Sequence, residues 1–551
     1  MGAATKESRY HHIIGGRRRS AAVVDFNNKP NQRRHHVTDT IATAPNPYLP
    51  STTTEPRFPK TSTELEECMK PLSNLWGMHN KELSDMLLFQ QQQQQHQQQD
   101  RQTTDHNNSR NDVVGIPSLT KEQLLQVLSL PLVPGDDVEI QQIVRSLYTG
   151  ANFMTNIYHG NKVHYRGLLE FSNICRSDCY YCGIRKSMNK PQQQHISCIE
   201  DGEGDGEKVT TASKLQRYLL DYDTIMDTVR WCAKRGYGSI MLQSGEVVSS
   251  KRINYLTKII NDIKQVVAPE MGISLSVGEL SHDQYQTLYD AGATRYLLRI
   301  ETTNPELFAK LHPQPQQTFH QRLQCLRTLN NVGYMVGTGV MIGLPTQTIE
   351  DLVNDILFFR DESYIDMIGM GPYILQRNTP TGTWWCHEHP DVFEAIQDKE
   401  IGIASSTQID RIHQYDASLY EITTRMIALT RLLLGDVNIA ATTALQTIHP
   451  MCGREVALMR GANILMPILT PKLQRSNYQL YEGKVCIDET KSQCKSCLEL
   501  RVMAAGKSIA YNERGDPPHY TRRKTKTKTR CDGRQNNNKG EIQTKFKATM
   551  A

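Results

Sequence analysis

Residues 165–468 alternate between two hydrophobic patterns. Short apolar runs are typical of buried strands, and stretches with an apolar residue every three or four positions are typical of amphipathic helices. Eight parallel strands separated by helices predict a closed (β/α)8 barrel of TIM type. The strand-like runs are 167–172, 239–244, 273–277, 296–301, 335–342, 367–374, 438–444 and 463–468. Helical stretches between them include 224–234, 252–266, 321–331, 349–360 and 417–434.

The chain before the barrel is polar. Residues 1–60 are basic, acid-poor and rich in Ser and Thr, which is typical of an organellar transit peptide, although a disordered basic tail has the same composition. Residues 61–118 combine weak helical periodicity with a glutamine tract. They are expected to be mostly disordered because they cannot bury a core.

The ordered barrel is expected to cover residues 119–505, beginning with a short amphipathic helix at 120–130. Residues 506–551 are expected to form a basic disordered tail. The fold class is therefore a barrel with disordered N- and C-terminal extensions. Segments 192–213 and 391–410 interrupt the repeat and are interpreted as surface insertions.

Composition narrows the function. The 551 residues are 38% hydrophobic with a mean hydropathy of −0.52, as expected where polar segments dilute a normal core. The net charge of +5 lies largely in the tails, which argues against a basic nucleic-acid surface on the barrel. No apolar run is long enough to predict a membrane span. Six of the 13 cysteines fall in two tight groups, a pattern that favours metal over disulfides.

The first group, Cys175, Cys179 and Cys182, has C-x3-C-x2-C spacing directly after the first strand. A cubane cluster normally takes four thiolates, so three cysteines can hold three irons and leave the fourth open to a ligand. A structural zinc loop is the alternative. Zinc prefers four ligands in paired spacings, and no fourth ligand is evident nearby.

Polar residues also follow the other predicted strands, where a barrel places its active site. Glu246 and Glu279 follow the second and third strands, Arg322 lies on the helix after the fourth, and Thr442-Thr443 close the seventh. Each has an ordinary explanation as a helix cap, an ion-pair partner or a good strand former. Their joint position on one rim favours a functional site.

The fourth strand carries Arg295, Arg299 and Glu301 on one face, because strand side chains repeat every two residues. A buried guanidinium needs a partner. Since Glu301 belongs to the upper rim, Arg295 is expected to point inward and hold an anionic ligand.

A second group, Cys486-x7-Cys494-x2-Cys497, follows the last strand. It is compatible with a small iron–sulfur cluster, with zinc, or with three unconnected thiols. The sequence does not identify a fourth ligand for a metal.

The chain resembles the radical S-adenosylmethionine (SAM) enzymes of the HydE type, the [FeFe]-hydrogenase maturases, over about residues 119–500. The resemblance rests on FSNIC, YCGIR, LQSGE, LSVGE, RYLLRIET, GLPTQT, ATTA, YQLY and the last cysteine group, in that order. That last group separates this family from the related biotin synthases and methylornithine synthases.

The resemblance implies a [4Fe-4S] cluster on the first three cysteines, which reductively cleaves SAM to a 5′-deoxyadenosyl radical. It implies a rim of residues that contact the cluster or SAM, namely Tyr181, Glu246, Glu279, Glu301, Arg322, Met367 and Tyr478. It also implies an anion-binding cavity inside the barrel, lined by Arg295, Thr442, Thr443 and Tyr481. The second cysteine group would hold an accessory [2Fe-2S] or [4Fe-4S] cluster.

The resemblance further implies a role in assembling the di-iron subcluster of hydrogenase. The substrate would be an iron complex bearing cysteine, carbon monoxide and cyanide, or another small anion. The partner maturases would be HydG and HydF, and the electron donor a protein such as ferredoxin; no nucleic acid or membrane is expected. The leader predicts a soluble protein in a hydrogenosome, mitochondrion or plastid matrix.

Two features depart from the family pattern. Ile300 stands where a histidine is common, and Gln376-Arg377-Asn378 replaces His-Pro-Asp. Two other functions stay open on the sequence alone. One is a related radical SAM enzyme with a small organic substrate, and the other is a zinc-stabilised binding protein without turnover.

Overall fold

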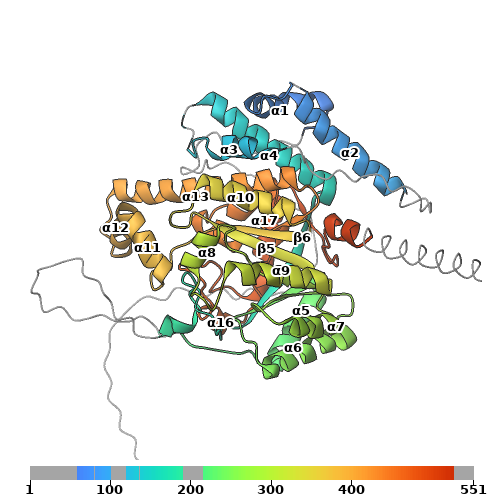
Figure 1. The fold of residues 1–551 in the computed structure, drawn as a ribbon, viewed down its shortest axis with the longest axis vertical. Helices are drawn as coiled ribbons and strands as arrows, with labels where there is room; N and C mark the ends of the chain where they lie inside the picture. Colours follow the sequence, from blue (N-terminus) through green and yellow to red (C-terminus); the bar gives the residue numbers. More distant parts are fainter. Residues whose placement is uncertain are drawn as a thin grey trace, which may run out of the picture. The chain divides into compact units, whose positions relative to one another are not determined.

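The computed structural model describes residues 59–79, 81–100, 119–133, 135, 137–189 and 215–525. Its central sheet is parallel, with strand order β7-β6-β5-β4-β3-β2-β1-β8. A further parallel bridge between Ala440 and Ile464 joins the chain just after β7 to β8, so the predicted closed barrel is confirmed. Figure 1 shows strands β5 and β6 with helices packed around them. The barrel strands are β1 Lys162–Ser172, β2 Ser239–Ser244, β3 Gly272–Ser276, β4 Arg295–Leu297, β5 Met335–Ile342, β6 Ile365–Pro372, β7 Asn438–Ile439 and β8 Ile464–Leu465.

Helices follow the strands and cover the outside of the barrel. The helices that precede β1 are α1 Ser62–Leu75, α2 Glu82–Asp100, α3 Lys121–Leu128 and α4 Val138–His159. Those between the strands are η1 Lys186–Asn189, α5 Tyr222–Ala233, α6 Ser250–Asp262, η2 Ile263–Val267, α7 His282–Asp290, α8 Pro305–Leu311, α9 Phe319–Val332, α10 Ile349–Asp361, α11 Pro380–Glu388, α12 Pro390–Glu400, α13 Ser406–Leu433, α14 Thr443–Ile448 and α15 Gly453–Met459. After β8 come α16 Lys472–Arg475, α17 Lys491–Ala504 and the short strand β9 Ser508–Ile509.

The two faces of the strands bury different side chains. Leu169 of β1 belongs to the large apolar layer between strands and helices. Its neighbour Leu168 packs with Met241 and Ile468 in a small separate cluster. This alternation is expected of a barrel strand whose successive residues point outward and inward.

Three strands, β4, β7 and β8, are shorter than predicted, and β8 ends at Leu465. β4 ends at Leu297, and Glu301 rejoins the sheet through a single bridge to Val340. Glu301 has φ 67°, which a continuous strand cannot accommodate. β7 ends at Ile439 because Thr442 is already the N-cap of α14.

The expectation that residues 61–118 are mostly disordered is wrong for the described part, 61–79 and 81–100. α1 and α2 pack on α4. The start of the glutamine tract also takes part in this packing. Gln90 is buried and accepts a hydrogen bond from Tyr158 at 2.6 Å. The weak periodicity concealed a complete apolar face: Leu65, Met69, Leu72, Leu83 and Leu87 are all fully buried.

The expected disordered tail is also wrong for its described part, residues 506–525. β9 pairs in parallel with β1, and the chain then crosses the amino-terminal end of the barrel. There Gly515 O accepts from Arg166 and Asn438, while His519 contacts Asp366 at 2.9 Å. The basic composition of this segment suggested disorder. In the structure its charged side chains instead bind acidic groups of the barrel. Residues 526–551 lie outside the described part.

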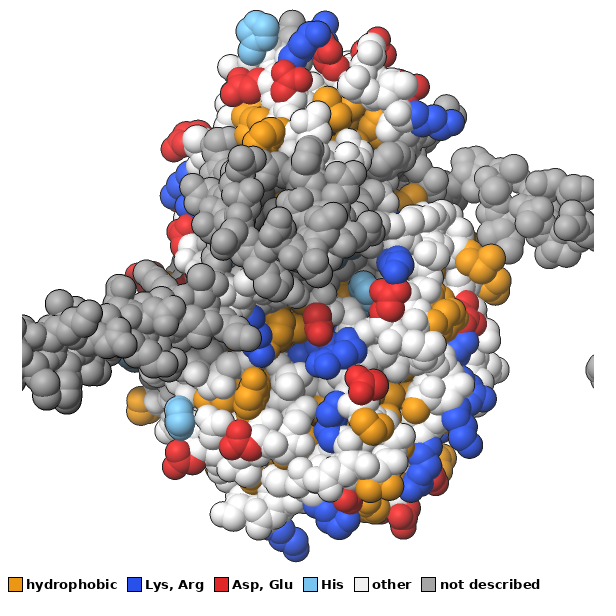
Figure 2. Space-filling view, turned by 90° about the vertical axis from the view of Figure 1, so that its right-hand side faces the viewer, with side chains coloured by type: hydrophobic (Ala, Val, Ile, Leu, Met, Phe, Trp, Pro, Cys, Tyr) orange, Lys and Arg blue, Asp and Glu red, His pale blue; other side chains and the backbone are white. Residues whose placement is uncertain are grey.

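Of the two predicted insertions, 192–213 lies outside the described residues. Segment 391–410 forms α12 and the start of α13, which pack against each other. On the face drawn in Figure 2, acidic and basic side chains are interspersed instead of gathering into a patch of one sign. Among the described helices, none combines the length and apolarity needed to cross a bilayer.

Candidate active site

The cysteine loop leaves the barrel at the carboxyl end of β1 and has no regular secondary structure up to η1. Asn173 anchors its start by donating to Gln216 O at 2.8 Å and Asn477 O at 2.7 Å. Gly183 packs so closely on the chain at Gln479 that a Cβ would lie 2.1 Å from its carbonyl oxygen. The loop is therefore fixed at Asn173 and at Gly183, on either side of the three cysteines.

Glu246 holds this loop from the end of β2. Its Oε1 accepts from Arg176 Nε and Ser177 Oγ, both at 2.8 Å, and its Oε2 accepts from the Glu279 amide at 2.7 Å. Its own amide lies 3.4 Å from Cys175 Sγ. The sequence placed Glu246 on the rim as a cofactor contact. In the structure its carboxylate is occupied by the chain's own donors, so it supports the cysteine loop.

Glu279 and Arg322, which were also predicted on this rim, form an ion pair with each other. Arg322 Nε donates to Glu279 Oε1, and both side chains are almost fully buried. A second guanidinium nitrogen donates to Arg299 O. The Glu279 carboxylate outweighs the effect of burial and raises the pKa of Arg322 above its usual value. This buried pair fixes the backbone of the chain that follows β4.

Tyr181, Arg299 and Glu301 converge beside the cysteines. Arg299 Nε lies 3.0 and 2.9 Å from the two Glu301 oxygens, and the Tyr181 hydroxyl lies 3.4 Å from Oε1. The positive φ of Glu301 is a strained conformation of the kind that concentrates at functional sites. Tyr181, which was expected on the cysteine loop, and Glu301, which was expected on the rim, therefore lie next to each other in the structure.

His312 is a site residue that the sequence analysis missed. Its Nδ1 lies 3.0 Å from Phe308 O, which can only accept, so Nε2 is left as the acceptor 3.4 Å from the Tyr181 hydroxyl. The ring stacks on Phe308 at 3.9 Å. Burial and Arg322 lower the pKa of His312 to about 3, so the ring is neutral. A lone histidine between helices carries no motif that could have revealed it.

The two remaining predicted cofactor contacts, Tyr478 and Met367, lie in different parts of the barrel. Tyr478 is buried, and its hydroxyl accepts from Gln243 Nε2 at 3.3 Å on the same side as the cysteine loop. Met367 instead lies in the lower half of β6, where its sulfur accepts from Arg166 at 2.6 Å. Met367 is the third residue of β6, which begins at Ile365 and ends at Pro372, so it lies near the amino-terminal end of the strand.

Arg295 is buried inside the barrel, as expected, and lines a small cavity there, but it has a partner within the chain. As the first residue of β4 it lies at the amino-terminal end of the barrel, and Nη2 donates to Asp516 and to Arg514 O. The expectation that it has no partner in the chain is therefore wrong. The sequence could not show this because Asp516 lies more than two hundred residues away, in the segment expected to be disordered.

Thr442, Thr443 and Tyr481 are near the upper half of the barrel. Thr442 Oγ1 is buried and has no hydrogen-bond partner, and it lies against Gly371 of β6. Thr443 starts α14, with its carbonyl accepting from Thr447. The chain at Tyr481 is joined to the loop after β6, because Glu482 accepts from Arg377 at 2.8 Å.

The donor set at the first site fits an iron–sulfur cluster. Cys175, Cys179 and Cys182 are all half-buried and unpaired by disulfides. Burial raises the pKa of all three thiols, that of Cys179 to about 12, so they must lose protons to bind iron.

The surroundings fit a further ligand. Buried polar atoms without partners cost stability unless something bonds them. Gln376 Oε1, Thr381 Oγ1 and Thr442 Oγ1 are such atoms. The segment that carries Gln376 and Thr381 lies against the cysteine loop, because the Thr381 amide donates to Tyr180 O at 3.0 Å.

The second cysteine group lies between the loop after β8 and α17. Cys494 is buried, and Cys486 is partly buried with its sulfur 3.7 Å from Arg454 Nη2. Cys497, one helical turn after Cys494, accepts from Arg501 Nε at 3.4 Å. The structure thus brings Cys486 and Cys494 together and turns Cys497 toward another partner.

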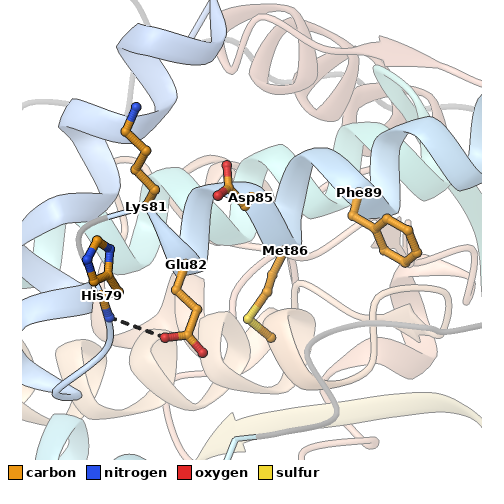
Figure 3. A pocket seen from close by; sticks show the side chains of 6 residues that line it. All are labelled: His79, Lys81, Glu82, Asp85, Met86 and Phe89. Atoms are coloured by element: carbon orange, nitrogen blue, oxygen red, sulfur yellow. Dashed lines mark hydrogen bonds between the residues drawn. The ribbon is translucent and has the colours of Figure 1, made fainter.

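A separate surface hollow of about 610 Å³ lies on the N-terminal helices. Its lining is shown in Figure 3 and includes the half-exposed ring of Phe89 beside Met86 and Glu82 of α2. It contains no barrel residue, and we assign it no role in the site.

Comparison with known proteins agrees with this geometry. A model of the Radical SAM superfamily matches residues 169–359. The chain is 37% identical over 363 residues, covering 66% of this chain and 86% of the relative, to the [FeFe] hydrogenase maturase subunit HydE of Thermotoga maritima. It is 24% identical over 369 residues, 66% of this chain and 83% of the relative, to 3-methylornithine synthase of Methanosarcina barkeri. A crystal structure of methylornithine synthase superposes with a TM-score of 0.52 at 21% identity, over 72% of this chain and 95% of that one, a likeness of fold.

Proposed function

Because the chain belongs to the HydE family of radical SAM enzymes, we propose that Cys175, Cys179 and Cys182 hold its [4Fe-4S] cluster and that Glu301 and Tyr181 bind SAM. The protein is a radical SAM enzyme of hydrogenase maturation. When bound, the cluster supplies one electron to the sulfonium of SAM, whose C5′–S bond then breaks to give a 5′-deoxyadenosyl radical and methionine.

The observation that carries the proposal is the convergence of the cysteine loop with Tyr181, Arg299 and Glu301 at one end of the barrel. A carboxylate and a hydroxyl at this place suit the ammonium and ribose groups of SAM. Arg299 lies against both oxygens of Glu301 and so holds the carboxylate in one orientation. The surrounding barrel wall excludes water, which protects a reactive radical.

The substrate part of the proposal rests on the family. We propose that the substrate is an iron complex bearing cysteine, carbon monoxide and cyanide, or a related small anion, exchanged with the maturases HydG and HydF. Thr442, Thr443 and Tyr481 are the proposed contacts, and a ferredoxin-like protein is the proposed electron donor. Arg295 is left out of these contacts, because it lies at the amino-terminal end of the barrel and pairs with Asp516.

Single alanine variants of the three cysteines test the cofactor assignment. Each is expected to lose the iron chromophore and 5′-deoxyadenosine formation, since three thiolates are the minimum for a cluster with one open iron. Cys325→Ala is the matched control, because Cys325 is a partly buried cysteine outside both groups. Normal SAM cleavage in any of the three variants would overturn the assignment.

A maturation assay separates the substrate proposal from the cofactor chemistry. Thr442→Val keeps the shape of the side chain and removes the hydroxyl, so it should leave SAM binding intact and reduce hydrogenase activation. Equal activation by Thr442→Val and the wild-type chain would remove Thr442 from the proposed cavity.

Two further parts rest on sequence alone. Residues 1–60 are proposed to direct the protein to an organelle matrix, and a reporter fused to them should leave the cytosol. The family also implies an accessory iron–sulfur cluster on Cys486, Cys494 and Cys497; acid-labile sulfide beyond that of the first cluster would support it.

A further inference from the structure

A buried ion pair joins the strand before the cysteine loop to the segment that carries Tyr478. Lys484 Nζ donates to Glu170 Oε1 at 2.5 Å, and the two side chains are 7% and 2% exposed. Glu170 lies on β1, two residues before that strand ends at Ser172. The sequence did not predict either residue as part of the site, because one charge in an apolar strand and one lysine in a loop form no motif.

The carboxylate of Glu170 points into the barrel. Glu170 comes two positions after Leu168, which packs with Met241 and Ile468 in the small inner cluster, and strand residues two positions apart share a face. The Thr470 hydroxyl donates to Glu170 Oε2 at 3.0 Å. The chain therefore bonds both carboxylate oxygens, which holds the carboxylate in one orientation.

Lys484 reaches back along its own segment to Tyr478. Its Nζ donates to Tyr478 O at 2.8 Å and lies 5.2 Å from the centre of the tyrosine ring. Gln243 is the register neighbour of Glu170 on β2, and it donates to the Tyr478 hydroxyl at 3.3 Å. Tyr478 is thus bonded at its carbonyl by the ion pair and at its hydroxyl by β2.

The Tyr478 hydroxyl is in a state to bind a ligand. Burial, together with the Glu170 charge, raises the pKa of Tyr478 well above its usual value, so the hydroxyl stays protonated. Because it accepts from Gln243, it keeps its own hydrogen to donate.

The segment around Tyr478 also rests on the cysteine loop. Asn173, before the three cysteines, donates to Asn477 O at 2.7 Å. After the cysteines, the Gly183 amide donates to Leu480 O at 2.9 Å. A displacement of Tyr478 would therefore change the wall of the site in which SAM is proposed to lie.

Stability alone does not explain a charged pair at this place. Taking two charges out of water is costly, and well-packed apolar residues of similar volume are often at least as stabilising. An ammonium, however, can donate to a carboxylate and to a carbonyl at the same time, which an apolar side chain cannot do. The pair is therefore suited to hold a neighbouring group in a defined place.

We propose that Glu170 and Lys484 are positioning residues that orient Tyr478 against bound SAM. Glu170 fixes the Lys484 ammonium, and Lys484 fixes the backbone of Tyr478, which forms one wall of the SAM site. The pair acts on the affinity for SAM through this tyrosine. The inference rests on the proposed function, because it requires SAM to bind beside the cysteine loop.

A double variant separates positioning from stability. Glu170→Gln combined with Lys484→Met removes both charges and keeps similar side-chain volumes, so the fold and the iron content should be retained. Methionine cannot donate to Tyr478 O, so the KM for SAM should rise at least about ten-fold, the effect of losing one charge-assisted hydrogen bond. The kcat for 5′-deoxyadenosine should stay close to that of the wild-type chain, as expected when binding is lost equally from substrate and transition state.

The single variants test the two members of the pair separately. Glu170→Gln leaves the Lys484 cation buried without a counter-charge, so it should lower the midpoint of urea unfolding more than the double variant does. Lys484→Arg keeps a cation with several donors, so it should recover part of the SAM affinity that Lys484→Met loses.

Glu421→Gln is the matched control. Glu421 is the largely buried partner of Arg425 and Arg460 and accepts from Tyr148, between α13 and α4 in the outer helical layer. Its loss should lower stability and leave the KM for SAM unchanged.

Two outcomes would overturn the proposal. One is a folded double variant whose KM for SAM equals that of the wild-type chain. The other is a double variant that does not fold, because the pair would then serve the barrel itself. A wild-type chain that neither binds nor cleaves SAM would instead contradict the proposed function.

Discussion

Asp516→Asn probes the closure of the barrel by the C-terminal segment. Arg295 is only 2% exposed, and of its donors only Nη2 is bonded, to Asp516 and Arg514 O, while Nε and Nη1 have no partner. Arg166 lies nearby, and burial together with the Arg295 charge lowers the pKa of Arg166 to about 9. Two buried cations therefore share one carboxylate.

Removing that carboxylate leaves both cations without a counter-charge, which typically costs about 3–5 kcal/mol. Asparagine keeps the shape and one acceptor oxygen, so the loss isolates the charge. Arg295→Met removes the cation and leaves Asp516 partly in water, so it should cost less. The double variant should recover most of the loss, because replacing both members of a buried pair is often close to neutral.

The assay is urea unfolding of the four chains of this double-mutant cycle, compared at equal m-values. Glu513→Gln is the control, because the Lys162–Glu513 pair in the same segment is solvent-exposed and should be worth less than about 1 kcal/mol. If Asp516→Asn destabilises the protein no more than Glu513→Gln does, the buried pair does not hold the segment and the argument fails.

The same pair sets a pH dependence. Burial alone would raise the pKa of the Asp516 carboxyl, but the charge and hydrogen bond of Arg295 outweigh it and leave that pKa below its usual value. A depressed pKa contributes stability that is present above the unfolded value of about 3.9 and is lost as pH falls through the folded value. Stability of the wild-type chain should therefore fall below about pH 4 more steeply than that of Asp516→Asn.

Four other predictions concern the site and the N-terminal helices. Glu246→Ala should weaken retention of the first cluster about ten-fold, measured as iron remaining after anaerobic gel filtration. Glu270 is exposed, so Glu270→Ala should retain the iron. Equal retention by the two variants would mean that the hydrogen bonds to Arg176 and Ser177 do not support the loop. His312→Ala should lower the rate of 5′-deoxyadenosine formation by removing the support of Tyr181, and an unchanged rate would make His312 a packing residue. Leu72→Ala should cost about 2–5 kcal/mol in urea unfolding because Leu72 is fully buried. Deletion of residues 1–100 should expose the face of α4 beneath α1 and give insoluble protein; a soluble, active deletion would show that the barrel does not need α1 and α2.

The sequence by itself determined the barrel and the first metal site. Strand-like runs and helical stretches repeat with periods that depend only on local backbone geometry, so eight units could be counted without coordinates. Cys175, Cys179 and Cys182 lie within eight residues of one another, and any fold of that loop keeps them close. Glu301 could be placed on the rim from its position at the end of the predicted fourth strand, and Tyr181 could be placed beside the cysteines from the family resemblance.

Tertiary structure decided which charged groups meet. The carboxylate of Glu246 could bind a cofactor ammonium, but in the folded chain it accepts hydrogen bonds from Arg176, Ser177 and a backbone amide. Arg295 pairs with Asp516, which comes from a distant segment of the chain. Hydrophobic periodicity reports how an element faces the core, but the partner of a buried charge depends on distances between segments far apart in the chain, and those distances exist only once the chain has folded.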